Sequence, residues 1–87
     1  MMRIKLHSDF KKLYKKLSKK DQQKIDARLT LFMSNPFTLV LNNHLLNGKW
    51  NGYRSIDIKG DLRALYKVVN DQECIFIALG NHNNLYS

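Results

Sequence analysis

Apolar residues recur first at every second position along the chain and then at helical spacing. Residues 2–7 alternate between apolar and basic side chains, which predicts a short strand with one buried face. A helix follows from Ser8 or Asp9, either of which can cap it, to about Lys19, because its apolar residues recur three and four positions apart. Residues 18–21 have the form of a capping box, with Asp in place of the usual Glu or Gln, and predict a second helix. This helix ends at the single proline, since the residue before proline is disfavoured in the helical region.

The second half of the chain has the pattern of a meander of strands. Residues 36–52 show no clear period and contain two Asn-Gly pairs, so we expect a loop with room for one helical turn. Three strands follow over residues 53–58, 62–69 and 73–79, joined by tight turns. The order strand–helix–helix–strand–strand–strand predicts a single α+β domain over residues 1–87, with two N-terminal helices packed on one face of a small antiparallel sheet.

The turn between the first two strands of the meander decides which side chains share a face. A two-residue hairpin at Lys59-Gly60 would place Ile58 opposite Asp61 and Ile56 opposite Arg63, and directly opposed residues share a face. One face would then carry charged side chains, namely Arg54, Asp61, Arg63 and Lys67. The helices would cover the other face, which carries Leu62, Ala64, Tyr66 and Val68. A three-residue turn would reverse this pairing.

The chain is strongly basic. Fifteen Lys and Arg stand against seven Asp and Glu, which gives a formal charge of +8 and favours nucleic acid, an anionic membrane surface or an acidic protein as partner. Seven lysines lie between residues 11 and 24, with Asp21 as the one acidic residue among them. A merely solvated helix face would intersperse the two signs, so this stripe favours phosphate binding. The residues that we expect to contact phosphate are Lys11, Lys12, Lys15, Lys16 and Lys19.

Cysteine usage and hydropathy predict a cytoplasmic protein. The single cysteine, Cys74, lies in an apolar run and is expected to be a small core residue, with no disulfide in the monomer. The first residues lack the apolar stretch of a signal peptide, and no segment approaches the ~20 apolar residues of a membrane span. The sequence has neither Cys/His metal spacing nor a Gly-rich phosphate loop, so we expect no metal and no cofactor.

Five residues stand out for chemistry, although each has an ordinary structural interpretation. His44 and His82 could be surface histidines, and Asp61 beside a glycine could simply form a turn. Tyr86 could seal the end of the core with its ring. Arg63 is harder to explain, because it interrupts an apolar strand and a buried arginine without a partner is costly. Together these groups suit cleavage of RNA by its own 2′-hydroxyl, which needs a general base, a general acid and a cation on the phosphate.

Four segments carry a combined pattern that is more specific than any one of them. They are NHLLNGKWNGYR (43–54), GDLRALY (60–66), GNH (80–82) and LY (85–86). With this pattern the sequence resembles the RelE/YafQ-like toxins of bacterial type II toxin–antitoxin systems, and the YafQ branch in particular. The resemblance implies a ribosome-dependent endoribonuclease, or mRNA interferase, that cuts messenger RNA in the decoding site by 2′-hydroxyl attack without a metal.

The resemblance also implies partners. The toxin would be neutralised by a small acidic antitoxin of the RelB/DinJ type, partly disordered when free and folding on binding. It would bind the ribosome and messenger RNA, with the lysine stripe on ribosomal RNA. It would meet operator DNA only through the antitoxin complex, and no membrane.

Residue by residue, the resemblance assigns catalysis to three positions. His44 matches the loop histidine of the YafQ branch, Asp61 its post-turn aspartate, and His82 its C-terminal histidine. The general base stays open among these three residues. His82 is favoured as acid or base, with Asp61 as its partner or as a positioning group.

Three further positions match substrate-binding residues, and one departs from the pattern. Arg54 and Arg63 match basic positions of the RelE branch that contact phosphate, and Tyr86 matches the aromatic residue near the family's end that orients a base or the phosphate. YafQ-like relatives often carry another histidine where this chain has Asp57. The expected hairpin places Asp57 on the face opposite Arg63, so either the turn is longer or Asp57 lies at the sheet edge without a chemical role.

Two other functions are compatible with the same sequence. A ParE-like toxin shares the architecture and inhibits DNA gyrase by binding it, although the two histidines favour a nuclease. A plain RNA-binding module would use the lysines for affinity and would not cleave.

Overall fold

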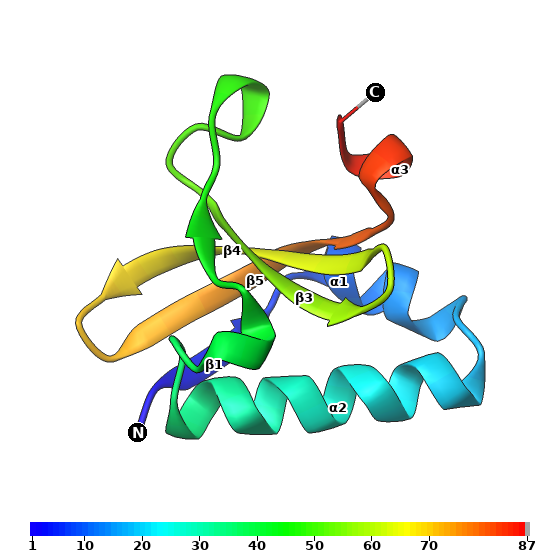
Figure 1. Ribbon diagram of the computed structural model, residues 1–87, viewed down its shortest axis with the longest axis horizontal. Helices are drawn as coiled ribbons and strands as arrows, with labels where there is room; N and C mark the ends of the chain where they lie inside the picture. The colour runs from blue at the N-terminus through cyan, green and yellow to red at the C-terminus, as the bar shows by residue number, and fades with distance from the viewer. Residues whose placement is uncertain (87) are drawn as a thin grey trace.

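A five-stranded sheet forms the centre of residues 1–86, the part of the chain that this computed structural model describes (Figure 1). Its strands are β1 (Arg3–Leu6), β2 (His44–Leu45), β3 (Arg54–Lys59), β4 (Leu62–Asn70) and β5 (Glu73–Gly80). Their order in space is β1-β5-β4-β3-β2. Ser87, the last residue of the expected domain, lies outside the described residues.

The predicted α+β class is confirmed, but the sheet is mixed and not purely antiparallel. β1 runs parallel to β5, with Ile4 beside Cys74, while the other neighbouring strands are antiparallel. Alternation of side chains marks a strand without fixing its direction, which explains the error. The additional strand, β2, has only two residues, too few to produce a period in the sequence.

Two helices cover one face of the sheet, as expected. They are α1 (Ser8–Lys15) and α2 (Lys19–Ser34), and a short third helix, α3 (His82–Tyr86), lies on the opposite face (Figure 1). Two single turns of 3₁₀-helix, η1 (Leu39–Leu41) and η2 (Gly48–Trp50), interrupt the long loop. Among residues 1–86 no helix is both long and apolar enough to cross a membrane.

The helix ends follow from side-chain caps. His7, outside the expected pair Ser8 and Asp9, caps α1, because its Nδ1 accepts the backbone N–H of Asp9 at 3.1 Å. Ser18 caps α2 as expected, with its Oγ 3.1 Å from the backbone nitrogen of Asp21. Because Ser18 has extended backbone, α1 stops before the end that the apolar spacing predicted.

Aromatic rings fill the space between the two long helices and the sheet. The ring of Phe32 in α2 meets Phe76 edge-on at 5.2 Å between centroids and Tyr66 at 4.9 Å. Phe10 of α1 packs against Phe76 at 5.9 Å. Burial raises the pKa of the Tyr66 phenol, so the ring stays neutral inside this core. These contacts bury one face of the sheet under the helices, so the polar side chains described below lie on the other face.

The register between β3 and β4 differs from the expected hairpin. Ile56 pairs with Ala64 and Asp57 with Arg63, so the expected pairing of Ile56 with Arg63 is wrong. The register shifts between Asp57 and Lys59, where β3 contains one residue more than β4. A bulge of one residue reverses the parity of every pair beyond it. Asp57 therefore shares the face of Arg63, although the burial of Ala64 on the helix face is as expected.

Candidate active site

Two segments project from the sheet face opposite α1 and α2: the chain from β2 through η2, and α3 (Figure 1). A second apolar cluster joins them to the sheet, made of Leu46, Leu65, Ala78 and Leu85 with Trp50, Tyr53 and Tyr86 packed against it. The indole Nε1–H of Trp50 donates to the carbonyl oxygen of Leu85 at 2.7 Å. This bond fixes α3 against the loop, although the sequence marked Trp50 only as part of a motif.

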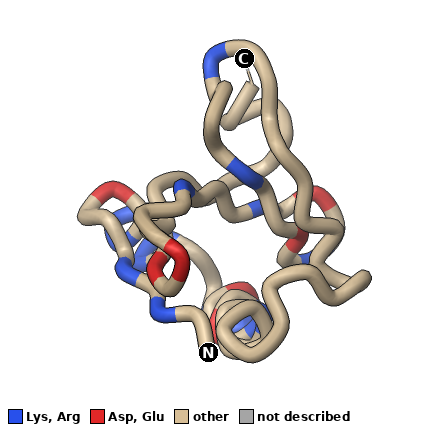
Figure 2. The backbone as a smooth tube through the Cα atoms, turned by 90° about the vertical axis from the view of Figure 1, so that its left-hand side faces the viewer, with Lys and Arg blue, Asp and Glu red and all other residues tan. Residues whose placement is uncertain are grey.

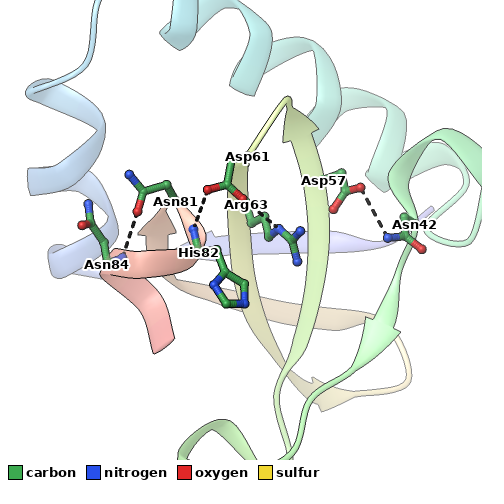
Figure 3. A network of polar contacts seen from close by, with 7 residues as sticks. All are labelled: Asn42, Asp57, Asp61, Arg63, Asn81, His82 and Asn84. Atoms are coloured by element: carbon green, nitrogen blue, oxygen red, sulfur yellow. Dashed lines mark hydrogen bonds and ion pairs between the residues drawn. The ribbon is translucent and has the colours of Figure 1, made fainter. Parts of the chain in front are cut away.

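Asp61 links the start of α3 to β4 (Figure 3). Its Oδ2 accepts the backbone N–H of His82 at 3.1 Å, and its Oδ1 lies 3.9 Å from Nε of Arg63. Arg63 in turn lies opposite Gly80 in the sheet, two residues before His82. The turn carboxylate, the strand arginine and the C-terminal histidine are therefore brought together, as the sequence predicted.

Tyr86 belongs to the same group. It lies four residues after His82 on α3, one helical turn away, and the two ring centroids are 4.7 Å apart. His82 is exposed, whereas the hydroxyl of Tyr86 is buried without a hydrogen-bond partner among the described residues. The imidazole thus rests against an aromatic ring and keeps its outer edge open to solvent.

His44 lies at the edge of the sheet in β2, and its orientation is set by a backbone contact. Nδ1 of the ring is 2.8 Å from the carbonyl oxygen of Asn42. A carbonyl oxygen can only accept, so the neutral imidazole carries its proton on Nδ1. Nε2 then presents a lone pair, which is the form a general base requires.

The sheet places His44 and Arg63 on one face. His44 pairs with Ser55, which pairs in turn with Leu65. Leu65 lies two residues from Arg63 along β4. With about 4.8 Å between neighbouring strands and about 7 Å between alternate residues, the Cα atoms of His44 and Arg63 are on the order of 12 Å apart. The two residues therefore lie on the same face of the sheet, on strands that are separated by β3.

Arg54 is separated from this group. It pairs with Tyr66, so the register places it on the helix side of the sheet, away from Arg63. Its Nε donates to Oδ1 of Asn43 at 2.8 Å, and its guanidinium lies 5.3 Å from the ring centre of Phe37. Asn43 also donates to the hydroxyl of Tyr66 at 2.7 Å. The expectation that Arg54 lies beside Arg63 on the charged face is therefore wrong, because the bulge in β3 reversed the parity.

The five lysines expected to contact phosphate are all exposed: Lys11, Lys12, Lys15, Lys16 and Lys19. Lys11, Lys12 and Lys15 lie on α1, Lys16 on the short connection and Lys19 at the start of α2, all in the helical layer behind the sheet. Figure 2 shows basic positions in this layer and also in the segment that projects beside the C-terminus. Basic positions therefore occur both in the helical layer and in the segment that projects beside the C-terminus.

Three polar residues of the same face were not recognised from the sequence as part of the site. These residues are Asn42, Ser55 and Asp57. Among residues 1–86, the hydroxyl oxygen of Ser55 and Oδ1 of Asp57 are buried without a hydrogen-bond partner. Nε of Arg63, which the sequence did predict for the site, is likewise buried without one. Asn42 contacts both Asp57 and His44. These groups lie on one face only because the bulge in β3 shifts the register between β3 and β4. The alternation of apolar and polar residues does not reveal a bulge.

Comparison with known proteins identifies the chain. Its residues 2–87 match the family described as bacterial toxins of type II toxin–antitoxin systems, YafQ. The mRNA interferase toxin YafQ of Escherichia coli (strain K12) is 33% identical over 69 residues, which cover 77% of this chain and 74% of that protein. The crystal structure of YafQ from E. coli strain BL21(DE3) superposes with a TM-score of 0.82 at 27% identity, and that of the E. coli DinJ–YafQ complex with 0.79 at 29% identity. Each superposition covers 100% of both chains.

The fold and its polar cluster therefore define a small bacterial toxin with two helices on one face of a mixed sheet. More specifically, the chain belongs to the YafQ family of type II toxins.

Proposed function

We propose that this toxin is an mRNA interferase, an endoribonuclease that cuts messenger RNA on the ribosome without a metal ion. Membership of the YafQ family and the name of the E. coli relative support the activity. The observation that carries the chemistry is the group of Asp61, Arg63 and His82 on the sheet face that also holds His44.

The reaction is a transfer within the RNA itself. Nε2 of His44 takes the proton of the 2′-hydroxyl, and the 2′-oxygen attacks the adjacent phosphorus. The bond from phosphorus to the 5′-oxygen breaks, and protonated His82 gives a proton to that oxygen. The products are a 2′,3′-cyclic phosphate and a 5′-hydroxyl. Histidine suits both roles, because its ordinary pKa of ~6.5 lies close to neutral pH.

The remaining residues bind and orient. Arg63 places its guanidinium on the phosphate, where negative charge increases in the transition state. Asp61 holds the first backbone N–H of α3 and so sets the direction of His82 over β4. Tyr86 supports the imidazole from one side and offers its ring edge to a neighbouring base.

Binding partners follow from the charge and the family. The exposed lysines of α1 supply affinity for ribosomal RNA without sequence choice. A RelB/DinJ-like antitoxin neutralises the toxin, as the E. coli YafQ structure with DinJ suggests by analogy. Operator DNA is reached only through that complex. We place the protein in the cytoplasm, where ribosomes are, with residues 1–87 as one toxin domain.

Mapping of RNA ends tests the proposed function. After brief expression of the toxin, translated messages should carry new 5′ ends inside their reading frames, and an untranslated copy with a mutated start codon should not. Plasmid supercoiling should be unchanged. Intact messages with lost supercoiling would indicate gyrase inhibition, and intact messages with retained RNA binding would indicate a non-catalytic module. Either result contradicts the proposal.

A further inference from the structure

Asn42 has a strained backbone conformation next to His44. Its φ angle is +46°, in the left-handed region that Gly and Asn adopt most readily. Its carbonyl oxygen accepts Nδ1–H of His44 at 2.8 Å. The conformation of this one residue therefore decides whether the imidazole finds its acceptor.

Asp57 fixes the side chain of Asn42 from the neighbouring part of the sheet. Nδ2 of Asn42 donates to Oδ2 of Asp57 over 3.4 Å, a long bond that spans from the loop to β3 (Figure 3). Asp57 is itself only partly exposed and pairs with Arg63 of β4. The carboxylate thus reaches His44 through Asn42, in the chain Asp57–Asn42–His44.

The other oxygen of Asp57 faces toward Arg63. The two residues are direct partners across β3 and β4, and Figure 3 shows the Arg63 side chain between Asp57 and Asp61. Oδ1 of Asp57 and Nε of Arg63 are both buried without a hydrogen-bond partner among the described residues. A buried carboxylate oxygen without a hydrogen-bond partner costs folding free energy, so the stability of the fold does not explain this carboxylate.

We propose that Asp57 and Asn42 are a pair of positioning residues that hold His44 in the tautomer a general base needs. The proposal rests on the proposed function, in which His44 takes the 2′-hydroxyl proton. Asp57 anchors the Asn42 side chain, Asn42 keeps its left-handed conformation, and its carbonyl keeps the proton on Nδ1 and the lone pair on Nε2. In many catalytic and metal-binding sites, a hydrogen bond at one ring nitrogen of a histidine fixes the tautomer and the orientation of the nitrogen that reacts. Here the orienting carboxylate acts through an intervening asparagine.

The direct test is the ¹⁵N–¹H spectrum of the His44 ring, recorded at about pH 8, where an ordinary histidine is neutral. The His82→Ala background permits expression and removes one ring from the spectrum. We expect a protonated Nδ1 and an unprotonated Nε2. Asp57→Ala should move the proton partly or wholly to Nε2, whereas Asp57→Asn, which keeps an acceptor for Asn42, should largely preserve the original pattern.

Two further variants keep this test decisive if Asp57→Ala fails to fold. Asn42→Gly removes the amide that reaches Asp57, and a glycine without that anchor is free to leave the left-handed conformation, so this variant should shift the tautomer in the same direction. Asp71→Asn removes a carboxylate from the exposed turn at the far end of β4, and it should change nothing. A proton on Nε2 in the parent protein, or an unchanged spectrum in both Asp57→Ala and Asn42→Gly, would overturn the proposal.

Cleavage gives a second readout in the protein with His82 intact. Asp57→Ala should lower kcat by about tenfold or more with little change in KM, and Asp57→Asn should restore most of it. The ring spectrum does not depend on cleavage, so the nuclease function and the positioning role of Asp57 and Asn42 can be refuted independently. A protein without nuclease activity but with the expected tautomer shift would refute the proposed function alone. Full kcat in Asp57→Ala would refute the positioning role.

Discussion

Replacing His82 with alanine should lower the rate of messenger RNA cleavage by about 10²–10⁴-fold, the usual contribution of a general acid or base. The reason is chemical and not structural, because Asp61 accepts the backbone N–H of His82, which alanine retains. The ring is exposed, and its loss leaves no buried cavity. Toxicity in growing cells should disappear in parallel, and the cleavage rate on programmed ribosomes is the quantitative measurement.

The matched control for this variant is Asn83→Ala, which alters the next residue of the same short helix. Asn83 is exposed and should tolerate the change with unchanged cleavage. Both variants should melt at similar temperatures and should co-purify with the antitoxin. Full cleavage by His82→Ala would remove the imidazole from the mechanism.

Arg63→Ala should lower kcat by about 10²–10³-fold, the cost of losing one donor that stabilises developing negative charge. Arg63 makes its closest charged contact with Asp61, at 3.9 Å, and the Asp61 side chain is 58% exposed. Water can therefore solvate that carboxylate in the variant, but the buried Oδ1 of Asp57, directly opposite in β3, loses a neighbouring cation, so the free energy of unfolding should be measured beside kcat. Arg63→Lys should recover part of the rate, because lysine keeps the charge but not the planar fork.

Arg54→Ala is the informative comparison for Arg63. The guanidinium of Arg54 bonds to Asn43 and stacks over Phe37, on the helix side of the sheet. Its loss should cost about 1.5–3 kcal/mol of unfolding free energy, the range for hydrogen bonds to charged groups, with a small effect on kcat. Thermal denaturation and cleavage assays on both variants separate the two roles. Equal losses of kcat from both would contradict the placement of Arg54.

Most of the fold could be predicted from periodicity and punctuation. Apolar spacing gave both long helices, Ser18 gave the start of α2, and Asn-Pro gave its end. The alternation in 62–69 correctly placed Ala64 and Tyr66 under the helices. Strand direction was not predictable, because side chains alternate in the same way in parallel and antiparallel strands.

The candidate site was predicted in part, and the errors have one physical origin. Asp61, Arg63, His82 and Tyr86 flank the same strand ends, so their convergence follows from the meander alone. Arg54 and Asp57 depend on the register between β3 and β4. One extra residue in β3 exchanged their faces, and nothing in the local sequence distinguishes a bulge from a tight turn.

Contacts between residues far apart in the sequence could not be predicted either. Trp50 bonds to Leu85 across 35 positions, and Asn42 bonds to Asp57 across 15. Neither pair belongs to a local motif. They depend on the loop folding back over the sheet, and the second apolar cluster holds Trp50 in that arrangement.

The most direct test of the central claim is cleavage of an RNA with a single 2′-deoxy nucleotide immediately before the scissile phosphate. If His44, Arg63 and His82 act on one phosphodiester through the 2′-oxygen, cutting at that linkage should cease while other sites in the same message are still cut. The unmodified RNA should yield a 2′,3′-cyclic phosphate and a 5′-hydroxyl. Cleavage of the deoxy linkage at the rate of the unmodified one would contradict the mechanism.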